Sequence, residues 1–272
     1  MTGVHHRGGE VSASLVVDAT GPRRVLTDPL GLFEERRADR VVGKEYVVEG
    51  DHEVDSMLFR LDHDDAPGGY AWTFPAGDGV YKAGVCWFGD AHERRAGDED
   101  RTIDDYVRQW VEGDPRWESG PVRAVHAGDA VVNNSVNERA TDGLVAVGDA
   151  VSSINPLLGE GIRPGMESAE MAADVAIEAL DAGDTTRERL AASERRWNDR
   201  KGPYWKLHRA FAGLLYDFDA DQQDRFVRRM GSLSPATAER FQRYDLTLRD
   251  VVGLYPFKPG DLRKVPAVVR HL

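Results

Sequence analysis

A glycine-aspartate pair follows an apolar strand in the middle of the chain, where it could hold a ligand. Residues 144–147 read Leu-Val-Ala-Val and lead into Gly148-Asp149-Ala150. A glycine lets a ligand approach the backbone, and an aspartate beyond the strand faces the crevice at the carboxyl edge of a sheet. A carboxylate there can hydrogen-bond sugar or ribityl hydroxyls. We therefore expect Gly148 and Asp149 to bind a ligand of that kind.

A glycine-punctuated loop comes next and leads into a helix. It reads Asn155-Pro156-Leu157-Leu158-Gly159-Glu160-Gly161-Ile162. A helix start exposes N–H groups and the positive end of the helix dipole, which suits a negatively charged partner such as a reduced flavin ring near N1 and the C2 oxygen. Strand-Gly-Asp alone is as often an ordinary turn, but the loop and the small-residue helix favour ligand binding.

A second apolar strand ends in a polar turn near the start of the chain. It reads Leu15-Val16-Val17-Asp18-Ala19-Thr20-Gly21-Pro22. By itself this pattern is more often a plain strand end than a binding site. Its position before the Gly148-Asp149 motif gives it weight. The ligand hypothesis requires the two strand ends, at Asp18 and Asp149, to meet in the fold.

Aromatic side chains alternate along a third segment, Tyr70-Ala71-Trp72-Thr73-Phe74-Pro75, and Gly84 stands on the expected partner strand. On a strand, Tyr70, Trp72 and Phe74 point to one face and form a wall that suits a long apolar chain. Such a stripe alone is more often core packing. Its coincidence with both glycine motifs favours substrate binding.

Together these motifs resemble the geranylgeranyl reductase family of FAD-dependent, hydroxybenzoate-hydroxylase-like flavoproteins. The resemblance implies FAD as the cofactor, with contacts at Asp18, Gly21, Gly148, Asp149, Pro156, Gly159, Gly161 and Ile162. It implies a polyprenyl lipid substrate in contact with Tyr70, Trp72, Phe74, Pro75 and Gly84. The family's N-terminal Gly-x-Gly-x-x-Gly unit, which binds the ADP half of FAD, is not found, because Gly8-Gly9 precedes a strand instead of opening a helix.

The function implied is reduction of carbon–carbon double bonds in geranylgeranyl or other polyprenyl lipids, with NAD(P)H or ferredoxin left open as electron donor. Archaeal ether-lipid biosynthesis is favoured over chlorophyll or quinone side-chain reduction. The catalytic residues are unknown, since no side chain can be named as the proton donor. Two alternatives stay open: a flavin monooxygenase or halogenase of the same superfamily, and a truncated, flavin-free protein that binds isoprenoid or a partner without catalysis.

The strands and helices expected from the sequence pattern indicate a mixed α/β fold with three parts. Residues 1–40 and 125–185 are expected to form an incomplete, Rossmann-like FAD-binding domain, residues 41–124 an antiparallel-sheet substrate domain, and residues 186–272 a helical region. Strands are expected at 11–17, 45–49, 56–61, 70–74, 80–88 and 144–147. Helices are expected at 102–112, with Thr102 as N-cap, and at 163–180. The C-terminal helices should break at Gly202-Pro203, Ser234-Pro235, Pro256 and Pro259.

The helix expected at 163–180 has apolar residues that follow its helical spacing. They are Ile162, Met166, Ala169, Ala173, Ile177 and Leu180. Gly183 suits the end of this helix, because a glycine adopts the left-handed conformation that commonly stops one.

Composition limits the classes of function. The chain has 47 aspartate and glutamate residues against 35 lysine and arginine residues, so sequence-independent binding to nucleic-acid phosphates is not expected. The prevalence of aspartate, and of arginine over lysine, suggests a halophilic source, which with the family resemblance favours an archaeal one. The single cysteine, Cys86, points to a reducing compartment, and no run of about 18 apolar residues is present, so a cytoplasmic location is expected.

Neither a metal site nor a firm membrane anchor is indicated. The eight histidines are scattered without ligand spacing, so no metal is expected. Residues 257–270 are both basic and apolar, which could give peripheral contact with an anionic membrane, although a solvated tail is favoured.

Overall fold

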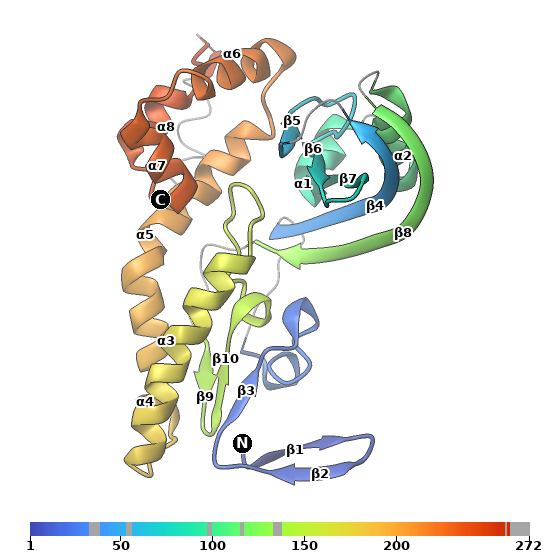
Figure 1. Cartoon of the computed structure of the whole chain (residues 1–272). Coiled ribbons are helices and arrows are strands. Elements are labelled where there is room, and N and C mark those ends of the chain that lie inside the picture. Colours follow the sequence, from blue (N-terminus) through green and yellow to red (C-terminus); the bar gives the residue numbers. More distant parts are fainter. Residues whose placement is uncertain are drawn as a thin grey trace.

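The computed structural model describes residues 1–32, 39–52, 56–96, 100–114, 117–132, 138–258 and 260–261. It confirms the predicted mixed α/β fold (Figure 1). A small sheet contains the parallel strands, a strongly curved antiparallel sheet lies beside it, and helices run along one side of both. A terminal hairpin projects from the small sheet.

The strands are β1 Gly3–His6, β2 Gly9–Ser12, β3 Val16–Asp18, β4 Arg40–His52, β5 Leu58–Arg60, β6 Gly69–Pro75, β7 Val80–Phe88, β8 Trp117–Val131, β9 Ala140–Thr141 and β10 Leu144–Ala146. The α-helices are α1 Gly89–Arg95, α2 Ile103–Gly113, α3 Ile162–Asp181, α4 Arg187–Leu190, α5 Ala192–Leu215, α6 Ala220–Met230, α7 Pro235–Arg243 and α8 Leu248–Leu254. The prediction of one strand over 11–17 is wrong. β2 pairs with β1 in the hairpin, whereas β3 pairs with β10.

The antiparallel sheet has the strand order β5-β6-β7-β4-β8. The long strands β4 and β8 curve together around its other members (Figure 1), and register shifts after Val47 and Val48 accompany the bend. Helix α2 covers one face, where Tyr106, Val107 and Trp110 pack in the core. Thr102 begins this helix with a capping box, as expected. The other face of the sheet is left to form the pocket described below.

Strand β8 was not predicted, although it pairs with β4 along most of its length. It also runs across the boundary that the sequence placed between residues 124 and 125. An edge strand with the mixed pattern Arg-Ala-Val-His-Ala-Gly-Asp shows little hydrophobic alternation, which explains why it was missed. The division into domains stays a prediction.

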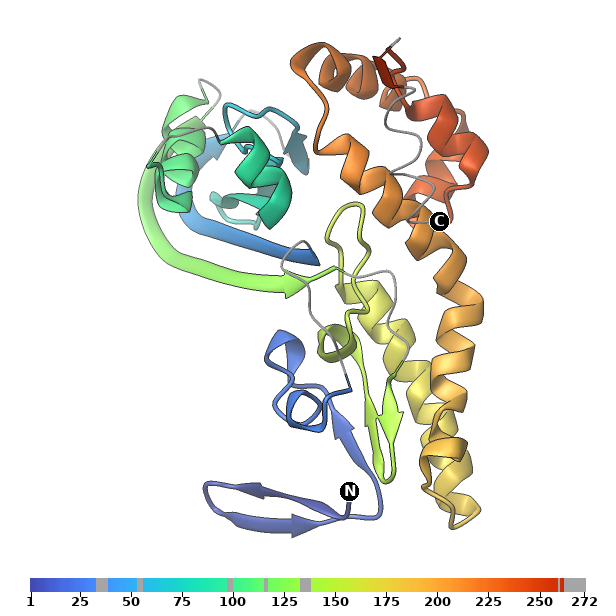
Figure 2. The same cartoon turned by 180° about the vertical axis from the view of Figure 1, so that it is seen from behind.

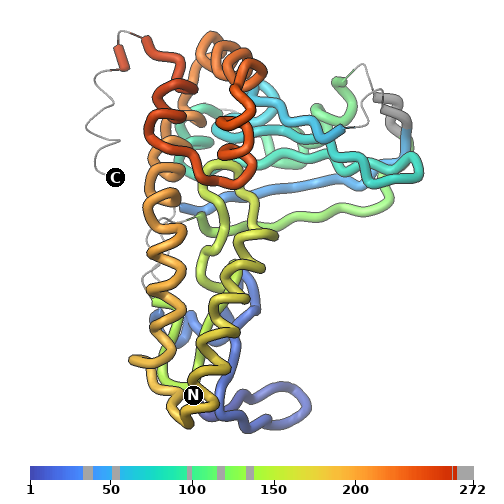
Figure 3. The backbone as a smooth tube through the Cα atoms, turned by 60° about the vertical axis from the view of Figure 1, so that its left-hand side comes forward, coloured from blue at the N-terminus to red at the C-terminus, as the bar shows by residue number. Residues whose placement is uncertain are grey.

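Helices α3 and α5 lie side by side along the molecule (Figures 2 and 3). The predicted break at Gly202-Pro203 is wrong, because α5 continues through Pro203. Trp197 and Trp205 lie on either side of this proline along the helix, and their buried rings meet edge to face at 5.6 Å. This packing offsets the backbone hydrogen bond that a proline removes. The breaks expected at Ser234-Pro235 and Pro256 are confirmed, with Ser234 capping α7 and α8 ending before Pro256, whereas Pro259 lies outside the described residues.

The spacing of α3 identifies the helix but not its packing face. Ile162, Met166 and Ile177 are exposed to 80%, 70% and 60%. The buried face instead carries small and medium side chains, including Ala172, Val175 and Ala179. Gly183 ends the helix in a left-handed conformation, as predicted.

No helix in the described ranges is both long and apolar enough to cross a bilayer. The membrane contact predicted for residues 257–270 falls largely on residues 259 and 262–270, which lie outside the described part of the chain.

Candidate functional site

The two predicted strand ends meet. β3 and β10 are parallel neighbours, with Asp18 opposite Ala146, and the amide of Val147 donates to the Asp18 carbonyl at 3.0 Å. Parallel strands end at the same edge of a sheet, so the turns after Asp18 and Val147 lie together. The arrangement on which the ligand hypothesis depends is therefore confirmed.

Open space faces both glycine turns. Gly21 and Gly148 have φ values of 71° and 60°, and a Cβ built on either would meet no atom within 4 Å. Only glycine adopts this backbone readily, and it leaves the peptide accessible. The Asp149 carboxylate is half-buried, accepts no hydrogen bond from the described residues, and has a pKa raised by burial. These groups remain available to a ligand.

Asp18 has a clear local role. Its fully buried carboxylate accepts hydrogen bonds from Thr20 N at 3.0 Å, Thr20 Oγ1 at 2.6 Å and Thr27 N at 2.9 Å. Burial would raise the pKa of Asp18, but the bonds from Thr20 and Thr27 outweigh it and lower the pKa. Asp18 thus shapes the turn that carries Gly21, and its direct contact with a cofactor stays a prediction.

Arg139 supports the turn at Gly148-Asp149 through hydrogen bonds, and it was not predicted from the sequence. The side chain is fully buried, and its Nη1 donates to Ser153 Oγ at 2.8 Å and Ser168 Oγ at 3.2 Å. Ser168 Oγ also accepts from the Gly148 amide at 3.3 Å. The guanidinium lies 4.2 Å from the ring centre of Trp197, and burial lowers its pKa to about 9. A lone arginine between Glu138 and Ala140 carries no sequence signal for this role.

The glycine-punctuated loop is held from its inner side. The buried Asn155 Oδ1 accepts from the amides of Leu157 at 2.8 Å and Leu158 at 3.2 Å. Gly159 has a φ of 69°, and a Cβ at Gly161 would lie 3.3 Å from Asp149 Oδ1. The structure therefore brings the predicted residue Gly161 to the Asp149 turn and Gly159 to the Tyr70 hydroxyl. Pro156 is buried within the loop, and Ile162 is exposed at the start of α3.

Two tyrosines fasten this loop to the rest of the molecule. Tyr70 of β6 donates its hydroxyl hydrogen to the Leu158 carbonyl at 2.7 Å, and Tyr216, which follows α5, donates to the Leu157 carbonyl at 2.6 Å. The two rings stack with centroids 6.5 Å apart. The expected aromatic strand is thus tied directly to the loop. Tyr216 was not predicted, because nothing in its helical context distinguishes it from core packing.

The aromatic wall forms as predicted. The rings of Tyr70 and Trp72 lie 5.9 Å apart, and those of Trp72 and Phe74 lie 6.1 Å apart. Trp72 crosses over Gly84, where a Cβ would come within 2.4 Å of the indole. The wall borders an open cavity of about 440 Å³ that Gly159 also lines. Pro75 is exposed at the end of β6 and is not part of this lining.

A second, more enclosed cavity of about 240 Å³ lies beside Tyr70, and its lining is mostly apolar. Leu157, Leu158 and Tyr216 contribute to it, together with Phe226 of α6 and Phe241 of α7. Because Tyr70 borders both cavities, the two adjoin at this side chain. The sequence indicated neither this space nor the part that the C-terminal helices play in it.

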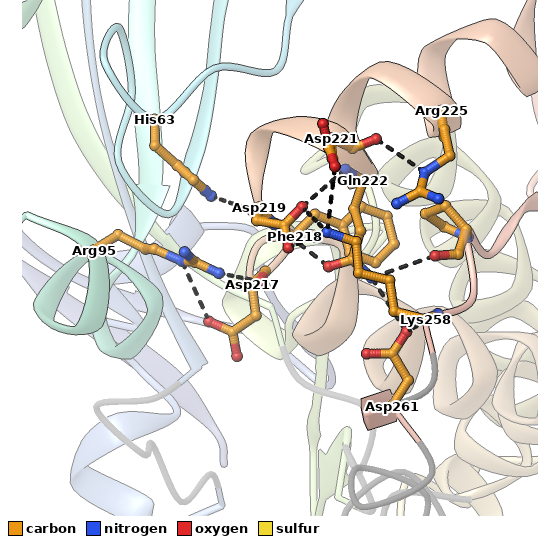
Figure 4. A network of polar contacts seen from close by, with 11 residues as sticks. His63, Arg95, Asp217, Phe218, Asp219, Asp221, Gln222, Arg225, Lys258 and Asp261 are labelled. Carbon is orange, nitrogen blue, oxygen red and sulfur yellow. Dashed lines mark hydrogen bonds and ion pairs between the residues drawn. The ribbon is translucent and has the colours of Figure 1, made fainter.

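Polar contacts hold the C-terminal helices against the segments next to the antiparallel sheet, at His63 and at the end of α1 (Figure 4). His63 Nε2 lies 2.7 Å from the Phe218 carbonyl, and Arg94 Nε donates to Asp217 at 3.1 Å. Arg95 also donates to the Asp217 carbonyl. These contacts fix the turn between α5 and α6, and with it the helices that close the second cavity.

Comparison with known proteins agrees with this geometry. The family model described as the geranylgeranyl reductase catalytic domain matches residues 40–127, which include β4 to β7 and most of β8. A digeranylgeranylglycerophospholipid reductase of Haloferax volcanii is 36% identical over 240 residues, which are 84% of this chain and 58% of the relative. One of the same name from Methanothermobacter thermautotrophicus is 30% identical over 84% of the chain and 58% of its own length. The chain thus spans less than two thirds of these curated relatives.

Solved structures share the fold at low sequence identity. A geranylgeranyl bacteriochlorophyll reductase-like protein of Thermoplasma acidophilum superposes with a TM-score of 0.77 at 21% identity, over 99% of this chain and 64% of that one. A flavin-dependent brominase gives a TM-score of 0.60 at 15% identity, over 97% and 64%. The matched catalytic region, the paired glycine turns and the aromatic strand all lie in one fold, and in these features the chain is similar to the geranylgeranyl reductases.

Proposed function

We propose that this chain carries the substrate pocket and part of the cofactor site of an FAD-dependent reductase, which saturates carbon–carbon double bonds of geranylgeranyl chains in archaeal ether lipids. The observation that carries the proposal is the shared loop. Residues 155–161 meet the Asp149 turn on one side and, through Gly159 and the Tyr70–Leu158 hydrogen bond, border the aromatic pocket on the other. A cofactor at the turn and an apolar substrate in the pocket would therefore meet.

The residues at the turns fit a flavin. The Asp149 carboxylate is partly desolvated and accepts no hydrogen bond from the described residues, which suits it to ribityl hydroxyls, and the bare backbone at Gly21 and Gly148 allows close approach of a polar chain. Gly159 and Gly161 leave the backbone of the loop without a side chain at two positions, which would allow a flat ring to approach it. In this proposal Asp149, Gly148 and the loop bind FAD, and Asp18 orders the opposing turn.

The pocket fits an apolar chain. Tyr70, Trp72 and Phe74 supply one wall, and Gly43 and Gly128 give a floor without side chains. When bound, reduced FAD supplies a hydride. The protein holds the alkene against that group, excludes water with its aromatic wall, and fixes the loop through Tyr70 and Tyr216. The names of the two reductase relatives agree with a digeranylgeranyl lipid as substrate.

The test is a product analysis. The chain, supplied with FAD in high salt, is incubated with a digeranylgeranylglycerolipid and either NAD(P)H or reduced ferredoxin, and the lipid is measured by mass spectrometry. Mass gains in steps of two hydrogens support the reductase and identify the electron donor. The shared fold of the brominase makes a monooxygenase or halogenase the second candidate, and gain of oxygen or halogen would establish it instead.

A flavin-free binding protein is the alternative from another class. Flavin titration of the purified chain, followed by visible absorbance and quenching of flavin fluorescence, separates the two. We expect saturable binding that Asp149→Ala weakens and that Asp142→Ala, an exposed control, leaves unchanged. Absence of binding together with retained affinity for geranylgeraniol would favour the flavin-free alternative.

A further inference from the structure

A polar row crosses the pocket face of the antiparallel sheet. Strand register places Trp72 opposite Gly84, Gly84 opposite Glu45, and Glu45 opposite His126. Directly opposed residues on neighbouring antiparallel strands project from the same face of a sheet. Glu45 and His126 therefore share the face that carries the aromatic wall, and both line its cavity.

The contacts within the row orient the histidine. Trp72 reaches across Gly84 and donates its Nε1 hydrogen to Glu45 Oε2 at 3.1 Å. The other carboxylate oxygen, Oε1, lies 3.2 Å from His126 Nδ1. Glu45 thus accepts on both oxygens and holds the Nδ1–H of His126. The imidazole is left with Nε2 away from Glu45, and in its charged form that atom carries the second proton.

The other acidic hydrogens at this cavity are poor donors. The Tyr70 hydroxyl is engaged with the Leu158 carbonyl, and burial raises the pKa of Tyr70 well above its ordinary value. Burial likewise raises the pKa of Cys86 to about 12. Both groups would hold their protons at neutral pH and release them reluctantly to carbon.

The remaining charged groups around the cavity are committed elsewhere. Lys44 pairs with Asp104, which belongs to the helix on the opposite face of the sheet. Asp129 pairs with Arg40. Of the described titratable side chains that line the cavity, His126 is the one placed to release a proton into it.

The position of His126 suits a substrate lying against the loop. Tyr70, Cys86, Gly43 and Gly128 stand opposite one another on successive strands. This row contacts the loop through the hydrogen bond from Tyr70 to the Leu158 carbonyl. His126 stands two residues along β8 from Gly128, which is about 7 Å. An alkene over the bare glycine floor would lie between the loop and the imidazole.

We propose that His126 is the proton donor of the reduction and that Glu45 is the positioning residue that orients it. The inference rests on the proposed function. A bound reduced flavin would supply the hydride for the C–H bond at one alkene carbon, and His126 Nε2 would supply the proton that the π electron pair takes at the other. The product would gain two hydrogens and the flavin would be oxidised. Neutral His126 would then regain a proton from solvent, since its side chain is 60% exposed.

The kinetic test compares His126→Gln with His5→Gln, an exposed control on the terminal hairpin. We expect His126→Gln to lower kcat by about 100-fold or more, as loss of a general acid does, with KM and flavin affinity unchanged. Added imidazole should restore part of the activity of His126→Ala. Glu45→Gln should also lower kcat, and Glu45→Asp should recover part of it. Normal kcat in His126→Gln, or a change in KM alone, would overturn the assignment while leaving the reductase proposal intact.

A second readout does not depend on turnover. Diethyl pyrocarbonate acylates accessible neutral imidazole, and peptide mass spectrometry reports each histidine separately. Geranylgeraniol in the pocket should slow modification of His126 and leave His5 unaffected. Equal modification of His126 with and without the lipid would overturn the inference. Absence of any lipid reduction by the unaltered chain would instead refute the proposed function itself.

Discussion

At the scale of single residues, Gly84 shows how one position sets the geometry of the pocket. A Cβ at this site would lie 2.4 Å from Trp72 and 2.5 Å from the Lys44 carbonyl. Both distances are shorter than real contacts allow, so any larger residue must displace the indole. The indole in turn holds Glu45. The row of Trp72, Glu45 and His126 can therefore form only because residue 84 has no side chain.

Replacing Gly84 by alanine should destabilise the protein by about 1–3 kcal/mol, because overpacking forces neighbouring groups out of place. The matched control is Gly128→Ala on β8, where a Cβ meets no atom within 4 Å. Urea unfolding in high salt measures both. We expect the control to keep wild-type stability while narrowing the pocket floor. Equal stability of the two variants would show that Trp72 does not lie across Gly84.

His208 is a second residue with a measurable role. It is fully buried, and its Nδ1 accepts from the Asn155 amide at 3.1 Å, on the inner side of the loop. Burial, and then the nearby charge of Lys201, lowers the pKa of His208 to about 4. The folded state therefore requires a neutral imidazole beneath the loop.

This lowered pKa makes stability depend on pH. An unfolded histidine titrates near pH 6.5, so between about pH 6.5 and 4 the unfolded chain binds more protons than the folded one. The contribution is fully present above pH 6.5 and is lost as pH falls, by about 3 kcal/mol at pH 4. His208→Asn keeps an acceptor for Asn155 but cannot titrate. Its free energy of unfolding should fall less than that of the wild type between pH 7 and 4, and parallel curves would refute the assignment.

At the scale of elements, α3 separates what sequence spacing can and cannot predict. The period of its apolar residues located the helix within one or two residues at each end. It did not locate the buried face, because Ile162, Met166 and Ile177 are exposed, whereas the buried residues are mostly alanines with Val175 and Met171. Small residues allow close approach of packed elements, which outweighs the burial of bulkier side chains here.

Substitutions on the two faces of α3 should differ in cost. Val175→Ala removes two buried methyl groups and should cost about 2 kcal/mol. Ile177→Gln, two residues further on, lies on the exposed face and should change stability by less than about 0.5 kcal/mol. Thermal unfolding of the two variants checks the face assignment. A larger loss for Ile177→Gln would mean that the exposed stripe is covered in solution.

The same comparison explains which parts of the site sequence could predict. The turns at Asp18 and Asp149, the loop and the aromatic strand have local signatures, and the structure brings them together as expected. Arg139, Tyr216, Glu45 and His126 act through partners far away in the chain, so only the fold reveals them. Pro203 inside α5 shows the opposite error, since a strong local signal was overridden by tertiary packing of Trp197 and Trp205.

At the scale of the whole molecule, the network of Figure 4 joins the antiparallel sheet domain to the C-terminal helices. His63 Nδ1 accepts from the Gly68 amide at 3.2 Å, so Nε2 carries the hydrogen that is donated to the Phe218 carbonyl. Burial lowers the pKa of His63, which favours this neutral form. The network sets the position of α6, whose Phe226 lines the second cavity.

High salt screens the ionic part of this network but not the hydrogen bond between His63 and the buried Phe218 carbonyl. His63→Ala leaves that carbonyl unpaired and should lower the local stability of α6 by about 1–3 kcal/mol, raising its amide exchange by roughly 5- to 150-fold. Asp217→Asn weakens only the partly exposed ion pairs with Arg94 and Arg95, so its effect should stay below about 5-fold. Hydrogen exchange by mass spectrometry compares α6 with α3, which should be unchanged in both variants. Uniform loss of protection across α3 and α6 in His63→Ala would show that the helices unfold with the whole chain and that the contact to the sheet domain does not control them separately.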